Sequence, residues 1–253
     1  MVSDMPEQNS MATSRTHDYA KYAADYAKLG FEGTYYLAFR DISALLEKHA
    51  TGPQALDYGC GSGRSTRFLK GLGYDTVGVD ISQDMLRQAR AEDETGEYRH
   101  IQSAEIPYDD ALFDVVFSSF VFIEVSNLAE ITAILAEMKR VLKPDGVVAV
   151  VTSPVTGING NWLSFSYDFP ENRRPIKSGD TVKLQIRGTD VVLYDYHWTD
   201  EDYRNVFARA GLAVRTVHTP LGRDDEGIEW KDEKTTPFIF IYLLEHSGRS
   251  VGA

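Results

Sequence analysis

Along most of this chain, the spacing of the apolar residues changes back and forth between that of a strand and that of a helix. Short apolar runs have the length and composition of strands, and those at 55–58, 76–80 and 113–117 are each followed by a stripe at helical spacing. The runs lie at residues 55–58, 76–80, 97–102, 113–117 and 147–152. The run at 113–117 is apolar enough to be covered on both faces of a sheet. This order predicts a parallel sheet with helices on both sides.

Both ends of the chain extend the pattern. Tyrosines at steps of three and four predict a helix over 17–29, and a second stripe predicts one helix over 35–49. Thr199 begins a helix with a capping box, and 212–217 and 238–244 are the last predicted strands. The fold class that we predict is therefore α/β and doubly wound. Its seven-stranded sheet is mostly parallel, and its last strand is antiparallel.

Residues 153–198 interrupt the alternation. Within them, 181–187 and 191–196 alternate in polarity around a turn at Gly188, which predicts a hairpin inserted before the last helix. We expect a single domain over 17–253, with lid helices at about 17–50 and a substrate-covering insert at about 153–198. Residues 1–16 are polar and are expected to be a disordered tail.

Composition narrows the classes of function. The 253 residues are 43% hydrophobic and 25% charged, and the net charge is −12, which opposes binding to nucleic acid. Cys60 is the single cysteine, and no cluster has zinc spacing, so we expect neither an intrachain disulfide nor a metal. No apolar run approaches the roughly 20 residues of a membrane helix. We expect a cytoplasmic monomer or homodimer, with no membrane partner and a small molecule as substrate.

A glycine cluster follows the first strand. Gly59, Gly61 and Gly63 stand before a helix, where they allow a tight turn and a close approach of a ligand to the backbone. The cluster fits neither a dinucleotide fingerprint nor a phosphate-binding P-loop, because Arg64 and Thr66 stand where a third glycine is needed and no Gly-Lys-Ser/Thr follows. Its place after a strand is where open α/β sheets bind ligands.

The spacing Asp57-x-Gly59-x-Gly61-x-Gly63 resembles the first motif of class I S-adenosylmethionine-dependent methyltransferases. Asp80 and three further segments resemble later motifs of that family in the matching order, over about residues 54–152. The segments are Ser103–Tyr108, Phe113–Ser119 and Arg140–Gly146. The resemblance implies S-adenosylmethionine as cofactor and S-adenosylhomocysteine as product.

The resemblance also implies roles for particular residues. The three glycines, with Cys60, would form the floor under the cofactor, and Asp57 would support the loop and the amino-acid end. Asp80 would hold the ribose hydroxyls, with Ile81 against the adenine. The remaining residues implied at the cofactor are Tyr22, Ser103, Ala104, Glu105 and Ser118, the last through its backbone carbonyl. The family often has Asp at the position of Ser103.

Two residues are candidates for a catalytic base. His197 follows Asp195 at the end of the insert, and alternation along a strand would let the carboxylate orient the imidazole. Glu124 follows the fourth strand, close to the expected methyl group. Each has an alternative role, His197 in local packing and Glu124 as a charge near a helix N-terminus. Aromatic candidates for substrate contact are Tyr19, Tyr26, Trp162, Phe165, Tyr194 and Tyr196.

These observations predict an enzyme that methylates an oxygen, nitrogen or carbon atom of a small aromatic or heterocyclic metabolite. The layout is similar to methyltransferases of bacterial secondary metabolism. A methyltransferase acting on protein or RNA is one alternative, although the acidic charge and the insert oppose it. A protein that binds S-adenosylmethionine without methylating anything is another.

Overall fold

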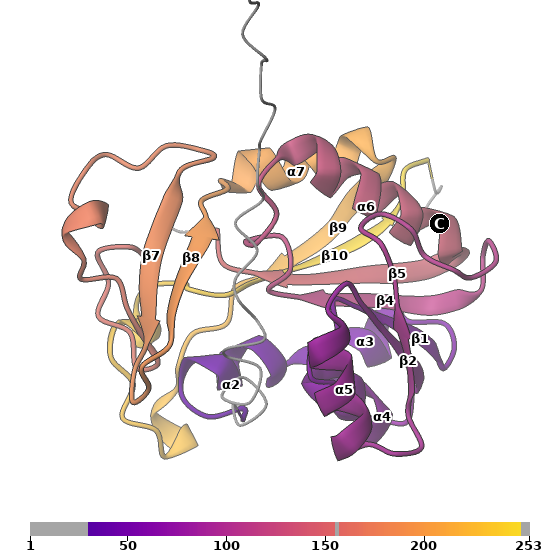
Figure 1. Ribbon diagram of the computed structural model, residues 1–253, viewed down its shortest axis with the longest axis horizontal. Coiled ribbons are helices and arrows are strands. Elements are labelled where there is room, and N and C mark those ends of the chain that lie inside the picture. The colour runs from indigo at the N-terminus through magenta and orange to yellow at the C-terminus, as the bar shows by residue number, and fades with distance from the viewer. Residues whose placement is uncertain (1–29, 155–156, 249–253) are drawn as a thin grey trace, which may run out of the picture.

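A twisted sheet of seven strands forms the centre of the molecule in the computed structural model, which describes residues 30–154 and 157–248 (Figure 1). The strand order is β3-β2-β1-β4-β5-β10-β9. β10 is antiparallel to both neighbours, and the pairs among β1 to β5 are all parallel. The strands are β1 Gln54–Tyr58, β2 Asp75–Asp80, β3 Glu97–His100, β4 Phe113–Ser119, β5 Leu142–Thr152, β9 Leu212–His218 and β10 Phe240–His246. The predicted fold class is confirmed.

Helices cover both faces of this sheet. Helices α6 (Leu128–Val141) and α7 (Asp200–Arg209) lie on one side. The other side carries α2 (Thr34–Phe39), α3 (Ile42–His49), α4 (Arg64–Gly71) and α5 (Gln83–Glu92), as Figure 1 shows. Along β4, Val115 and Phe117 pack into the core beneath α2 and α3, whereas Val116 packs into the core beneath α6 and α7. Because both faces of the strand are covered, its sequence is nearly continuous in apolar residues.

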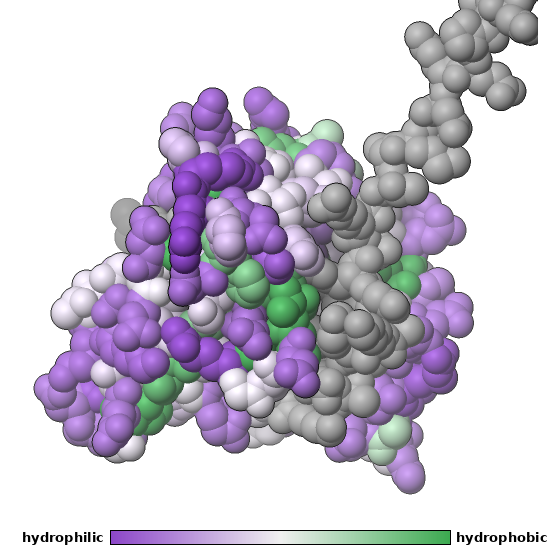
Figure 2. All heavy atoms as spheres, turned by 60° about the vertical axis from the view of Figure 1, so that its left-hand side comes forward, coloured by the Kyte–Doolittle hydropathy of each residue, from purple (hydrophilic) through white to green (hydrophobic). Residues whose placement is uncertain are grey.

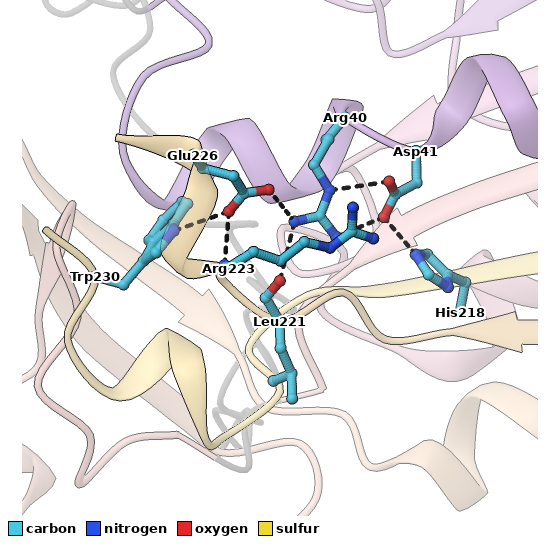
Figure 3. Close-up of polar contacts among 7 residues, drawn as sticks. All are labelled: Arg40, Asp41, His218, Leu221, Arg223, Glu226 and Trp230. Atoms are coloured by element: carbon cyan, nitrogen blue, oxygen red, sulfur yellow. Dashed lines mark hydrogen bonds and ion pairs between the residues drawn. The ribbon is translucent and has the colours of Figure 1, made fainter. Parts of the chain in front are cut away.

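The prediction of one helix over 35–49 is wrong, because the chain forms α2 and α3 with a break at Arg40 and Asp41. The Arg40 guanidinium donates to both carboxylate oxygens of Asp41, at 2.9 and 2.7 Å, and to the Glu226 carboxylate at 2.6 Å. His218 of β9 lies 2.7 Å from the same Asp41 carboxylate (Figure 3). Burial opposes ionisation of Asp41, but Arg40 and His218 lower its pKa to about 2. Contacts from the far end of the chain therefore fix the break.

Arg40→Ala should destabilise the protein by about 2 kcal/mol, because it leaves the little-exposed carboxylates of Asp41 and Glu226 without their charged donor. Urea unfolding followed by circular dichroism measures this loss. Arg87→Ala is the matched control, because Arg87 pairs with Asp84 on an exposed helix face and should cost less than about 0.5 kcal/mol. Equal losses in the two variants would show that the network does not stabilise the fold.

A second, antiparallel sheet forms the insert. It consists of β6 (Phe165–Ser166), β7 (Thr181–Ile186) and β8 (Val192–Tyr196), with a 3-10 turn η1 at Pro170–Asn172. The predicted hairpin is β7 and β8, which pair antiparallel. β6 was not predicted, because two residues are too few for an alternation pattern. The single-domain boundaries stay a prediction.

Hydrogen bonds join the insert to the rest of the molecule. The Tyr196 amide donates to the Ile123 carbonyl at 2.6 Å, and the Trp198 indole donates to the Val125 carbonyl at 3.1 Å. The fully buried Glu233, in the 3-10 turn η3 (Asp232–Lys234) before β10, accepts from Thr34 of α2 and from the Leu163 amide, both at 2.6 Å. The outward face of this region is mostly hydrophilic, with hydrophobic residues in small patches (Figure 2).

Candidate active site

A cavity of about 300 Å³ lies at the carboxyl ends of the central strands and extends beneath the insert. Its lining on the sheet side includes Tyr58, Gly59, Cys60, Gly61, Ser62, Asp80, Ile81, Ser82, Met85, Ile101 and Ser103. On the insert side it includes Phe165, Tyr167, Leu184, Leu193, Asp195 and Tyr196. One cavity thus reaches both the glycine loop and the aromatic part of the insert.

The glycine loop brings bare backbone to the cavity. Gly59 has φ +69°, and its amide donates to the Val79 carbonyl at 2.8 Å. A Cβ atom on Gly59 would lie 2.2 Å from Cγ2 of Val121, so no side chain fits there. Gly61 and Cys60 also line the cavity, whereas Gly63 begins α4 outside its lining. Of the residues predicted to form the floor under the cofactor, Gly59, Cys60 and Gly61 therefore line the cavity and Gly63 does not.

Asp57 lies behind this loop and supports it. Its side chain is fully buried outside the cavity lining, and Oδ2 accepts hydrogen bonds from Ser65 and Thr66 in the first turn of α4, both at 2.7 Å. Burial raises the pKa of Asp57 to about 6, although the two hydroxyl donors oppose the rise. Asp57 thus joins the loop to α4 and does not line the cavity, and its predicted role at the amino-acid end of the cofactor stays a prediction.

Asp80 sits at the end of β2 and lines the cavity. Oδ1 accepts from the Ser82 amide at 2.7 Å, and Oδ2 accepts from the Gly61 amide at 2.8 Å. Burial raises the pKa of Asp80, while these amides act in the opposite direction. Each carboxylate oxygen keeps capacity for a further hydrogen bond. The next residue, Ile81, is 52% exposed and lines the same cavity, so an apolar surface adjoins the carboxylate.

The other predicted cofactor residues divide between the cavity and its surroundings. Ser103 lines the cavity and donates to Glu130 at 2.6 Å. Ala104 and Glu105 lie outside the lining, and Glu105 is exposed. Ser118 is buried within β4, and its neighbour Ser119 lines the cavity. The strand continues to Ser119, two residues beyond the predicted run at 113–117. The predicted contact through the Ser118 carbonyl stays a prediction.

Aromatic rings from distant segments enclose the other end of the cavity. Tyr35 of α2 packs edge-on against Phe120 and Phe165, with centroids 5.8 and 5.0 Å away. Phe165 stacks on Phe238 at 5.2 Å, and Tyr167 lines the same space. Phe120 has φ +59°, an unfavourable conformation for an aromatic residue and one that tends to occur at functional sites. These five residues, the aromatic chamber, can hold a flat apolar group.

The predicted substrate residues are only partly in this chamber. Phe165 and Tyr196 line the cavity, and their contact with a substrate stays a prediction. Trp162 is fully buried outside the lining, where its indole donates to the Gly157 carbonyl at 2.6 Å. Tyr194 is 40% exposed, because alternation along β8 turns it away from the buried face. The predicted contacts at Tyr19, Tyr22 and Tyr26 lie outside the described residues.

Two carboxyl groups face the cavity beside the aromatic chamber. Glu124 lies in the loop between β4 and α6, and Asp195 lies on the buried face of β8. Burial raises the pKa of Glu124 well above its usual range, and the charge of Asp195 adds to this effect. Burial alone raises the pKa of Asp195 to about 7. Among the described residues, no hydrogen bond donor reaches either carboxyl group.

His197 lies outside this cavity. β8 ends at Tyr196, and the His197 backbone then turns to pair with Asp180 and Gly179, with both hydrogen bonds at 2.8 Å. Its buried Nδ1 has no hydrogen bond partner within the described part of the chain. Burial lowers the pKa of His197, with Asp202 and Asp180 acting in the opposite direction. Of the two base candidates, the structure brings Glu124 to the cavity, together with Asp195 in place of His197.

The cavity residues fit S-adenosylmethionine. Residues 59–61 leave room against the backbone, and Asp80 can accept from the ribose hydroxyls beside the apolar surface of Ile81. When bound, this cofactor supplies a methyl group on a positively charged sulfur. The fold and the cavity therefore agree with an α/β methyltransferase.

Comparison with known proteins supports this class. Residues 56–150 match the family described as a methyltransferase domain. Over 97 residues the chain is 35% identical to malonyl-[acyl-carrier protein] O-methyltransferase of Salmonella typhimurium, which covers 38% of each chain. Over 102 residues it is 35% identical to demethylmenaquinone methyltransferase of Clavibacter sepedonicus, covering 39% of this chain and 40% of the relative. The matches thus span about two fifths of these relatives.

The similarity of fold extends further than that of sequence. The crystal structure of an S-adenosylmethionine-dependent methyltransferase from Clostridium acetobutylicum superimposes with a TM-score of 0.61 at 15% identity, covering 91% of this chain and 99% of that one. The match over residues 56–150 and the similarity of fold agree with the resemblance to class I S-adenosylmethionine-dependent methyltransferases. Within residues 30–154 and 157–248, no helix is long and apolar enough to cross a membrane, and no His, Cys, Asp or Glu cluster could hold a metal ion.

Proposed function

We propose that this protein transfers the methyl group of S-adenosylmethionine to an oxygen, nitrogen or carbon atom of a small aromatic or heterocyclic molecule. The observation that carries the proposal is the single cavity that joins Asp80 and the glycine loop to the aromatic chamber. The two relatives compared above are named for acting on malonyl-[acyl-carrier protein] and demethylmenaquinone, so the family accepts varied acceptors.

The residues of the chain contribute orientation and proton removal. A flat acceptor held by the aromatic chamber would face the methyl group, and alignment of this kind can supply about 7–11 kcal/mol of the barrier. Glu124 and Asp195 line the acceptor end of the cavity, where either could take a proton from the acceptor, and burial raises the pKa of both carboxyl groups. Such a base contributes about 10²- to 10⁴-fold.

The enclosed cavity favours a small acceptor over protein or RNA. The insert is joined to the loop after β4 by backbone contacts at Tyr196 and Trp198, so it covers the acceptor end of the cavity. A polymer would need an open groove at this position. The net charge of −12 also opposes an RNA backbone.

Titration calorimetry with S-adenosylhomocysteine tests the proposal. We expect micromolar binding, weakened about 10- to 100-fold by Asp80→Ala, since charged hydrogen bonds contribute about 1.5–3 kcal/mol each. Asp75→Ala is the matched control, because Asp75 is exposed at the opposite end of the same strand and should leave binding unchanged. Failure of the folded protein to bind the product would overturn the proposal.

A second measurement distinguishes an enzyme from a binding protein. Release of S-adenosylhomocysteine is followed while the protein, loaded with S-adenosylmethionine, is offered aromatic phenols, amines and activated carbon acids. Turnover with any of them supports the proposal. Tight binding of the cofactor with no turnover across the whole set would favour the alternative of a non-methylating binding protein.

A further inference from the structure

Asp195 and Glu124 are brought together by a backbone contact between two distant segments. The Tyr196 amide at the end of β8 donates to the Ile123 carbonyl in the loop after β4, at 2.6 Å. Asp195 and Glu124 adjoin the two ends of this hydrogen bond, and both line the cavity. The contact therefore places two carboxyl groups on one wall, beside the aromatic chamber.

The described groups around this pair do not neutralise it. Three phenols lie near Asp195: Tyr35 from α2, Tyr167 after β6 and Tyr203 from α7. Burial raises the pKa of each, and the charge of Asp195 raises it further. These phenols are therefore neutral at physiological pH. Arg64 of α4 is the cation on the cavity wall, and it lies over the Tyr35 ring at 4.9 Å and donates to the Gly30 carbonyl at 2.9 Å. None of the hydrogen bonds of Arg64 within the described residues reaches Asp195 or Glu124.

A buried carboxylate without a charged partner is unfavourable, and a cationic ligand relieves that cost. An alcohol would leave the charge in place, and a carboxylate ligand would add a third acid to the wall. We propose that the methyl acceptor carries a basic nitrogen, which Asp195 and Glu124 bind as an ammonium group and from which Asp195 takes a proton. This inference rests on the proposed function and specifies its acceptor.

The movement of charge during the reaction agrees with this assignment. The ammonium N–H proton passes to the Asp195 carboxylate, the nitrogen lone pair forms the bond to the methyl carbon, and the electron pair of the broken carbon–sulfur bond stays on sulfur. The positive charge thus moves to the methylated nitrogen and remains beside the carboxyl wall. Electrostatic stabilisation of the position where charge develops is a large catalytic term. The proton on Asp195 leaves to solvent when the product departs.

Matched ligands of different charge test the proposal. Protein saturated with S-adenosylhomocysteine is titrated calorimetrically with benzylamine, 2-phenylethylamine and 3-phenylpropylamine, and with the alcohol and the carboxylate of each skeleton. We expect the best amine to bind at least about 10-fold more tightly than its alcohol, and the carboxylate most weakly. Amine binding should tighten from pH 6 to 8, because Asp195, whose pKa is about 7, then loses its proton.

Variants of Asp195 and Glu124 test whether these two residues cause the preference for the amine over the alcohol. Asp195→Asn should weaken amine binding at least about 10-fold and leave alcohol binding within about twofold, and Glu124→Gln should also weaken the amine. Asp190→Asn is the control, because Asp190 is exposed on the turn of the same hairpin. Retained binding of S-adenosylhomocysteine shows that each variant is folded.

The outcomes separate this proposal from the proposed function. Equal binding of alcohol and amine, an amine preference that survives both variants, or no amine binding while S-adenosylhomocysteine binds would overturn the amine assignment. The proposed function would stand in all three cases. Failure to bind S-adenosylhomocysteine itself would overturn the proposed function.

Discussion

Gly59→Ala should weaken binding of S-adenosylhomocysteine at least about 100-fold while the fold is retained. The new Cβ would lie 2.2 Å from Val121 Cγ2, and φ of +69° already strains any residue with a side chain. The loop would have to move away from Val121 and into the space that the cofactor needs. Titration calorimetry measures the affinity, and circular dichroism checks the fold.

Two further variants separate the clash from the strain. Gly73→Ala is the control, because Gly73 has φ +93° with nothing within 4 Å of its Cβ position. Alanine there would add about 1–2 kcal/mol of backbone strain without a steric clash. It should leave binding unchanged. Val121→Ala combined with Gly59→Ala should restore part of the affinity. Wild-type affinity in Gly59→Ala would show that the loop does not form the floor of the cofactor site.

The cofactor half of the site could be predicted because its residues act close to their own strands. Gly59 and Gly61 stand in the turn after β1, and Asp80 ends β2. Parallel strands bring these two strand ends to one edge of the sheet. The end of β4 lies two residues beyond the predicted run, since strand ends are difficult to place from sequence. Local pattern therefore predicted the position of this half but not every contact.

The acceptor half depends on contacts between segments far apart in the chain. Tyr35, Phe120, Phe165 and Phe238 come from four separate segments, and no local pattern shows that their rings meet. Asp195 is an exception, because the alternation of β8 places it on the same buried face as Leu193. A single acidic residue on an otherwise apolar strand face could have identified Asp195 as a site residue by itself. The sequence interpretation instead gave Asp195 only the role of orienting His197.

The break between α2 and α3 has a similar explanation. The apolar stripe of residues 35–49 is continuous, so sequence alone predicts one helix. The break is fixed by His218 and Glu226, which lie nearly two hundred residues away in the chain. Tertiary contacts here override a local preference, as they do for many helix boundaries.

Asp195→Asn should stabilise the folded protein above neutral pH. The folded-state pKa of Asp195 is about 7, above its ordinary value of 3.8, so the folded state binds more protons than the unfolded state between these values. The favourable term is present at low pH and is lost as pH rises toward 7. The wild type should therefore lose about 3 kcal/mol relative to Asp195→Asn between about pH 5 and 8, because each pKa unit corresponds to about 1.4 kcal/mol.

Urea unfolding of the unliganded protein at pH 5, 6, 7 and 8 measures this difference. Asp190→Asn serves as the control, and its stability should follow that of the wild type across the range, because Asp190 is exposed. Other buried acids, such as Asp57, change with pH in all three proteins and cancel in the comparison. Parallel curves for wild type and Asp195→Asn would show that Asp195 is ionised and already stabilised in the free protein. Stability curves that diverge as pH rises would show that the Asp195 carboxyl group destabilises the free protein. This is expected of a residue that serves binding or catalysis rather than stability.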